Sequence, residues 1–175
     1  MSITLISTVT VGSGGAATID FNSIPQTFTD LLILCSARTT QSSEDDLRVR
    51  FNSDTASNYP FRSLFGTGTG SGSGNGTLNF AYLGAISGTA FTANTFANQS
   101  GYIPNYTGSS SKTLSTDSVS ENNGTGATQL LVASRWTGTA AITTVTLSGA
   151  SANLAQHSTA SLYGITRGSG GATVS

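Results

Sequence analysis

Hydrophobic and polar residues alternate along most of this chain with the period of two that is typical of β-strands. The plainest case is residues 47–52, Leu-Arg-Val-Arg-Phe-Asn, in which the alternation is strict. No segment of eleven or more residues has the periodicity of an amphipathic helix. Turn signals at regular spacing between the apolar runs predict an all-β chain, a single antiparallel β-sandwich of the jelly-roll type with about eight to ten strands.

Some of the predicted strands carry more specific expectations. In residues 3–11 the apolar side chains are expected on one half-buried face. Residues 31–39 are apolar on both faces at first, which predicts a central strand covered on two sides. Pro60 places the strand that begins near Ser57 at a sheet edge. The remaining predicted strands are residues 17–21, 47–52, 77–83, 112–120, 128–136, 141–148 and 159–167.

Two glycine-rich segments complete the expected organisation. In residues 66–76 every second residue is glycine, which predicts a flexible loop inside the domain. Residues 1–167 are expected to form one sandwich domain, followed by a flexible Gly-rich tail at residues 168–175. The beginning of the chain lacks a basic segment followed by a continuous apolar one, so we expect no signal peptide. No apolar stretch approaches the roughly 18 residues of a membrane helix, and we expect no membrane partner.

Charge is scarce, and hydroxyl groups replace it. Of 175 residues only 15 are charged at neutral pH, 7 Lys or Arg and 8 Asp or Glu, against 28 Thr, 27 Ser and 21 Gly. Charged residues make up about a quarter of an average protein. The net charge of −1 gives no electrostatic reason to bind nucleic acid. Strands rich in Thr and poor in charge favour a surface that another protein covers over a catalytic surface.

The residues that usually carry chemistry do not form a recognisable motif. His157 is the only histidine and Cys35 the only cysteine, so a catalytic triad and a His/Cys metal cluster both lack members. Cys35 lies in an apolar run and is expected to be buried. We expect no enzymatic activity, no catalytic residues and no cofactor.

Two weaker site hypotheses remain. Glu44, Asp45 and Asp46 form an acidic loop that could bind calcium, although adjacent carboxylates on a loop are more often a solvated turn. Asp54 would join such a site only if the two loops meet. The aromatic residues include Tyr59, Tyr102 and Tyr106, which could contact a glycan or a protein, and whose alternative role is packing in the core or at a sheet edge.

Three segments resemble small β-sandwich structural proteins of tailed bacteriophages, of marine and cyanobacterial phages especially. They are residues 19–31 (IDFNSIPQTFTDL), 50–59 (RFNSDTASNY) and 159–165 (TASLYGI). The resemblance extends from residue 3 to about residue 167, and its motifs are strand and turn signatures.

The resemblance implies a non-enzymatic virion component that is assembled in the host cytoplasm. It would be a capsid decoration or cement protein or a head-fibre protein, whose partners are the major capsid protein or other virion proteins, and which we expect to be a homo-oligomer. The alternative is a tail-associated receptor-binding domain that recognises host-surface glycans. Residues 1–11 and 168–175 are candidates for arms that add a strand to a neighbour.

Overall fold

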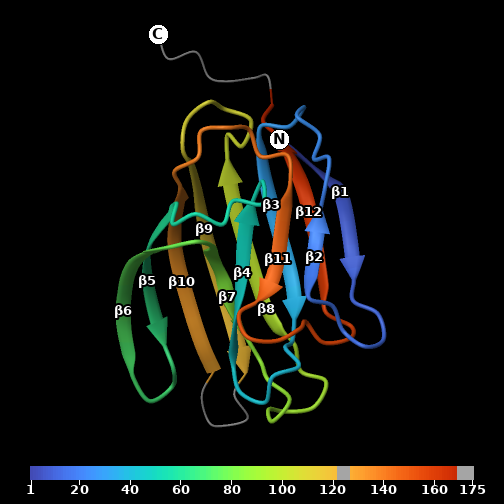
Figure 1. The fold of residues 1–175 in the computed structure, drawn as a ribbon, viewed down its shortest axis with the longest axis vertical. Helices are drawn as coiled ribbons and strands as arrows, with labels where there is room; N and C mark the ends of the chain where they lie inside the picture. The colour runs from blue at the N-terminus through green and yellow to red at the C-terminus, as the bar shows by residue number, and fades with distance from the viewer. Residues whose placement is uncertain (122–126, 169–175) are drawn as a thin grey trace.

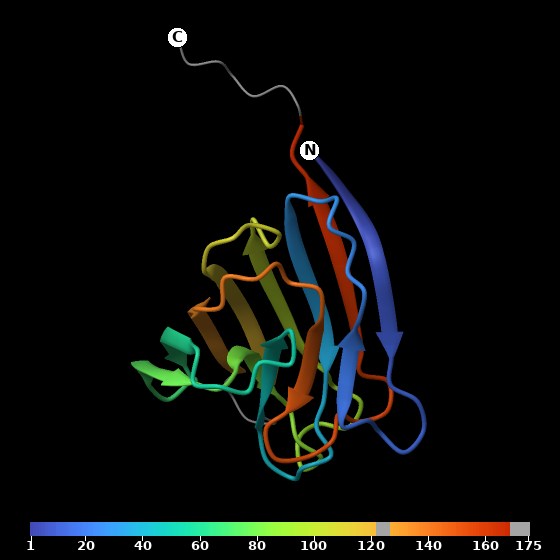
Figure 2. The same ribbon diagram turned by 45° about the horizontal axis from the view of Figure 1, so that its top comes forward.

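The computed structural model describes residues 1–121 and 127–168. This part of the chain contains twelve β-strands and no helix. The strands form two antiparallel sheets that lie face to face (Figures 1 and 2). The predicted all-β sandwich is therefore confirmed. The strands are β1 (Ser2–Thr10), β2 (Thr18–Phe21), β3 (Asp30–Ala37), β4 (Asp45–Phe51), β5 (Tyr59–Gly66), β6 (Ser71–Leu78), β7 (Ala81–Ile86), β8 (Ala97–Pro104), β9 (Lys112–Glu121), β10 (Ala127–Trp136), β11 (Val145–Gly149) and β12 (Thr159–Thr166).

The strand order is that of a jelly roll with an extension. The small sheet has the order β2-β11-β4-β7, and the large sheet begins with the matching order β1-β12-β3-β8. In these eight strands the chain passes back and forth between the two sheets, as in a double Greek key. The large sheet then continues through β9-β10-β5-β6, where β9–β10 and β5–β6 are two antiparallel pairs of consecutive strands. We call these four strands the extension.

The core lies between the facing sides of the two sheets. In β3 the inward side chains Leu31 and Ile33 are fully buried, and in β4 so are Leu47 and Val49. Burying one such side chain stabilises the fold by about 1.5–3 kcal/mol. The inner side of the extension is more polar, with Thr116, Ser118, Ser120 and Ser134 all buried.

The expectation for residues 31–39 was half wrong. The inward face of β3 is buried, but Leu34 on its outward face is 41 % exposed, because no layer covers the outside of the large sheet in the described part of the chain. Residues 3–11 depart from the prediction for a different reason. A register shift between Leu5 and Ser7 ends the simple alternation, so Ile3 and Leu5 point outward and are each 53 % exposed. Residues 2–10 are also paired with β12 as β1, so they are not a free arm.

The glycine-rich segment is not simply a loop, which corrects the prediction for residues 66–76. Residues 71–78 form the edge strand β6, paired with β5. Gly72 and Gly76 leave space into which aromatic rings of β5 pack: a Cβ atom on Gly72 would lie 2.6 Å from Phe65 Cζ, and one on Gly76 would lie 3.0 Å from Phe61 Cε1. Aromatic side chains over strand glycines replace the packing that the glycines lack.

Two further expectations need comment. Because β6 pairs with β5, the strand that contains Pro60 is not an edge strand, and the described chain has twelve strands, which is more than the predicted range. Most of the predicted tail, residues 169–175, lies outside the described residues.

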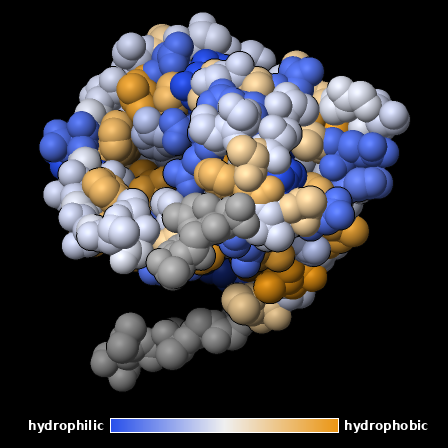
Figure 3. Space-filling view, turned by 90° about the horizontal axis from the view of Figure 1, so that it is seen from below, coloured by the Kyte–Doolittle hydropathy of each residue, from blue (hydrophilic) through white to orange (hydrophobic). Residues whose placement is uncertain are grey.

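Pale colours, which mark residues of intermediate hydropathy such as Ser, Thr and Gly, cover much of the end of the molecule shown in Figure 3.

Candidate functional site

The outer face of the large sheet collects the exposed apolar side chains. Alternation along each strand, together with the register between strands, assigns side chains to this face. Nine large hydrophobic side chains are exposed in the described residues, and seven of them project from it. We call this surface the large-sheet outer face. The seven are Ile3, Leu5, Leu34, Leu64, Tyr102, Val119 and Leu131.

Differences in side-chain size produce a depression on this face. One row of cross-strand neighbours runs from Tyr102 of β8 through Ser115 of β9 and Ala133 of β10 to Arg62 of β5. Two small residues thus lie between two large ones. The depression above them has a volume of about 520 Å³. Its other outward-facing side chains are Pro60, Pro104, Thr113 and Arg135.

A second depression of about 500 Å³ adjoins the first and shares Arg62, Ser115 and Ala133 with it. It continues over the extension to Leu64 and Leu131, and to Ser73 and Asn75 at the sheet edge. Volumes of roughly 300–1,000 Å³ are typical of sites for small ligands. The two together form a shallow groove, which we call the outer groove.

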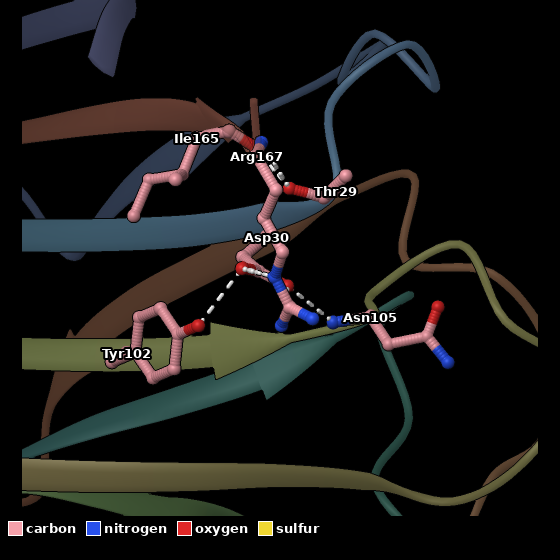
Figure 4. Close-up of polar contacts among 6 residues, drawn as sticks. All are labelled: Thr29, Asp30, Tyr102, Asn105, Ile165 and Arg167. Atoms are coloured by element: carbon pink, nitrogen blue, oxygen red, sulfur yellow. Dashed lines mark hydrogen bonds and ion pairs between the residues drawn. The ribbon is translucent and has the colours of Figure 1, made fainter. Parts of the chain in front are cut away.

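A network around Asp30 fixes one wall of the outer groove (Figure 4). The Tyr102 hydroxyl donates to Asp30 Oδ2 at 2.8 Å, and the Asn105 backbone N–H donates to Oδ1 at 2.9 Å. Arg167 donates through Nε to Oδ2 at 3.1 Å and through its terminal nitrogen to Oδ1 at 3.0 Å. Arg167 is further tied to Thr29, whose hydroxyl accepts its backbone N–H at 3.2 Å.

The same network keeps Asp30 ionised although it is only 1 % exposed. Burial by itself would raise the pKa of this carboxyl group. The hydrogen bonds from the Asn105 N–H, Tyr102 and Arg167, with the positive charge of Arg167, outweigh that effect and hold the pKa below its usual 3.8. A carboxylate held in this way fixes the phenol ring of Tyr102 at the rim of the groove.

Two arginines of the groove lack such a partner. The Arg62 side chain donates only to the carbonyl of Phe61, at 2.8 Å, and the Arg135 side chain makes no hydrogen bond or ion pair within the described residues. Both side chains are exposed. No acidic residue lines either depression. The outer groove therefore presents two guanidinium groups that are free to bind an anion.

The tyrosine predictions separate into one accessible residue and two buried ones. Tyr102 is 37 % exposed and lines the groove, whereas Tyr59 and Tyr106 are fully buried, so the expectation that these two contact a partner was wrong. The Tyr59 hydroxyl accepts from the Phe51 N–H at 3.1 Å, and burial raises its pKa to about 12. The Tyr106 hydroxyl donates to the Pro25 carbonyl. Both residues pack in the core, which is the alternative role that the sequence analysis considered for them.

The acidic residues 44–46 are not brought together. Asp45 and Asp46 are consecutive residues of β4 and so point to opposite faces of the strand. Asp45 is buried and accepts the backbone N–H groups of Asp46 and Ser151, at 3.0 and 3.1 Å. Asp54 instead accepts from Trp136 and Asn58, at 2.7 and 2.9 Å. Within residues 1–121 and 127–168, no three His, Cys, Asp or Glu side chains are grouped closely enough to hold a metal ion.

The groove residues that sequence reasoning missed are Arg62, Arg135, Asp30 and Arg167. The alternation around Arg62 and Arg135 is visible in the sequence, but their proximity depends on the pairing of β5 with β10. Cys35 is buried as expected, and burial raises the pKa of its thiol to about 12. His157 is exposed in the loop before β12.

In the described part of the chain, no helix is both long enough and apolar enough to cross a membrane. Comparison with known protein families, with curated proteins and with solved structures found no match to this chain.

Proposed function

We propose that this protein is a non-enzymatic structural component of a phage virion, a decoration or cement protein or a head-fibre protein that docks on the capsid through its large-sheet outer face. The observation that carries the proposal is the concentration of exposed apolar side chains on that face. Seven of the nine exposed in the described residues lie on it, surrounded mainly by Ser and Thr, with Arg62, Asp117 and Arg135 among the few charged residues of the same face. The phage origin itself rests on the sequence resemblance.

The composition of this face suits contact with protein. Leu131 and Leu64 are direct cross-strand neighbours, and Leu34 lies in the same row of the sheet, separated from them by Asp117 and Ser100. Protein interfaces combine apolar contacts with hydrogen bonds from neutral polar groups and contain few charges at their centre. Contiguous exposed apolar surface on a folded protein commonly marks an interaction site.

The edges of the large sheet favour self-association as a second mode of assembly. The edge strand β6 is made of Ser, Gly, Asn, Thr and Leu, without a charge or a proline along its length. Natural sheets usually protect a long edge strand from pairing with another chain by means of charged residues or prolines, and β6 has neither. A homo-oligomer joined at β6 would present several large-sheet outer faces to one capsid.

A binding assay with capsids that lack this protein tests the proposal. Leu34→Asp and Leu131→Asp each place a charge on the large-sheet outer face, at positions exposed enough for the variants to fold. We expect each to weaken co-sedimentation with the capsids by more than about tenfold, since an unpaired charge in an interface must be desolvated. Ser148→Asp, on the outside of the small sheet, should bind like the wild type. Equal binding by all three variants would contradict the proposal.

The second candidate function is a tail-associated domain that binds host-surface glycans. The outer groove favours it, because an exposed aromatic ring and hydroxyl groups line a depression of ligand size. Tyr102→Ala would then abolish binding to host-surface glycans and leave capsid binding unchanged. In the decoration role the same substitution should affect capsid binding instead.

A further inference from the structure

The outer groove has a charge pattern that points to a specific class of ligand. Arg62 lies directly opposite Ala133, and Arg135 is two residues further along β10, so the two arginines are diagonal neighbours on one face. The backbones of diagonal neighbours in a sheet are roughly 7–8 Å apart, which is within reach of two long side chains. We propose that the outer groove binds a saccharide that carries a carboxylate group. This proposal deepens the glycan-binding candidate function and does not depend on capsid docking.

The electrostatics favour an anion. Two like charges that lie close together without a counter-ion repel each other, and a bound anion relieves this repulsion. Asp30 is the nearest acid at the rim, but Arg167 already pairs with it. Asp117 projects from the same face one row away and lines neither depression. The groove itself therefore carries positive charge.

The guanidinium groups of the outer groove suit a carboxylate ligand. A guanidinium donates two parallel N–H groups to a carboxylate and gains both charge and geometry from the match. Exposed arginines that are not tied to protein acids keep these donors available. The side chain of Arg135 makes no hydrogen bond or ion pair within the described residues, and that of Arg62 donates only to one backbone carbonyl.

The remaining lining fits the body of a sugar ring. Tyr102, Pro60 and Pro104 supply flat apolar surfaces for its C–H groups, while Thr113 and Ser115 supply hydroxyls for its hydroxyl groups. Sites for small ligands typically combine such apolar walls with a few polar groups. The adjoining depression, which ends at Ser73 and Asn75, offers room for further sugar units.

The site is also held in shape before a ligand arrives. The hydrogen bond from Tyr102 to Asp30 fixes the phenol ring at the rim (Figure 4). A ring that is already ordered does not have to lose rotamer freedom on binding. Ser115 and Ala133 on the floor are small side chains that lie on two directly paired strands.

Titration calorimetry with matched ligands tests the proposal on the full chain. The probes are a trimer of galacturonic acid, its fully methyl-esterified form, a dimer of sialic acid and sodium sulfate. We expect at least one of the two acidic saccharides to bind and to lose at least about tenfold in affinity when the salt concentration is raised from 0.05 to 0.5 M. The ester and sulfate should bind at least about tenfold more weakly than the acidic saccharide that binds.

Variants then locate the site. Arg62→Gln and Arg135→Gln should each reduce the affinity by about tenfold, the loss expected when one charge-assisted hydrogen-bonding group is removed. Arg50→Gln on the small sheet is the matched control and should leave the affinity unchanged. Tyr102→Ala should weaken binding, and Asp117→Asn should strengthen it slightly. Circular dichroism checks that every variant is folded.

The outcomes separate this proposal from the candidate function on which it rests. Equal affinity for the galacturonate trimer and its ester, with no effect of the arginine variants, would overturn the acidic ligand and leave a neutral-glycan site. Sulfate that binds as tightly as the saccharides would reduce the groove to a simple anion site. If neither acidic saccharide nor the ester binds, both the proposal and the glycan-binding function fail, whereas the capsid-docking proposal is untouched.

Discussion

The outer faces of the two sheets are built by the same alternation and yet are different surfaces. On the small sheet the outward positions include Asp20, Arg48 and Arg50, and each has a local partner. Asp20 accepts from Thr146 at 2.7 Å, Arg48 lies 4.1 Å from the centre of the Phe80 ring, and Arg50 donates to the Asn79 carbonyl at 3.0 Å.

On the large sheet the outward positions are mainly apolar or hydroxyl-bearing, and the two arginines of the groove have no acidic partner in the described residues. On the small sheet Asp20 and Arg50 have hydrogen-bond partners within the molecule, although the Nε of Arg48 is buried without one. An apolar face with unpaired cations gains most from a partner. This contrast is the reason that we propose the large-sheet outer face as the interacting surface.

The prediction with the largest expected effect tests whether the large-sheet outer face is already covered in the free protein. Leu147→Ala, at a fully buried position of β11, should lower the free energy of unfolding by about 2–5 kcal/mol because it leaves a cavity. Leu131→Ala, at a position that is 43 % exposed, should lower it by less than about 1 kcal/mol. Urea denaturation of both variants measures the difference. Similar losses would show that the face is buried in solution.

The second prediction compares one acid on each face. Asp30→Asn should lower the free energy of unfolding by about 2 kcal/mol. It removes the negative charge of a buried carboxylate and so weakens the hydrogen bonds that this group accepts from Asn105, Tyr102 and Arg167. Asp20→Asn, on the exposed small-sheet face, should change it by no more than about 0.5 kcal/mol. The measurement is again urea denaturation. Equal free energies of unfolding for the two variants would show that the hydrogen bonds of Asp30 do not stabilise the protein in solution.

The third prediction is a pH dependence of opposite sign for the two faces. The pKa of Asp30 is below 3.8 in the folded protein, so the stability it contributes is present above pH 3.8 and is lost as the pH falls below it. For Asp46, burial raises the pKa above 3.8, so its ionisation costs stability as the pH rises above that value.

Denaturation curves recorded between pH 2 and pH 7 test both signs. Asp30→Asn should flatten the loss of stability in acid, and Asp46→Asn should be more stable than the wild type at pH 7. A steeper acid transition in Asp30→Asn, or a less stable Asp46→Asn, would contradict the assignment of these carboxylates.

The smallest expected effect concerns two neighbouring positions on opposite faces of β3. Cys35 points inward, is 5 % exposed and has a pKa raised by burial to about 12, so iodoacetamide should not label it in the folded protein at pH 8. Leu34→Cys in a Cys35→Ser background should be labelled readily. Mass spectrometry after timed exposure reports both. Rapid labelling of Cys35 in the wild type would contradict the placement of β3.

The sequence predicts the sandwich well, because an alternation such as that of residues 47–52 depends only on which face of a strand is buried. It fails where the outcome depends on neighbouring strands. Leu34 is apolar but exposed since no layer covers its side of the sheet, and the glycines of β6 become a strand because Phe61 and Phe65 pack over them.

The candidate site shows the same limit. Tyr102 was predicted as a contact residue and lines the groove, but nothing in the sequence near Tyr59 and Tyr106 separates these buried tyrosines from the accessible one. Arg62 and Arg135 are 73 residues apart in the chain (135 − 62) and meet only through the pairing of β5 with β10. Long-range strand register is what the local pattern lacks.

A cryo-electron-microscopy map of the purified virion tests the central claim most directly. We expect density for this protein at capsid lattice positions, with the large-sheet outer face, and Leu34 and Leu131 in particular, turned towards the capsid. Density in which the small sheet faces the capsid and the large-sheet outer face is open to solvent would contradict the account, as would density confined to the tail tip.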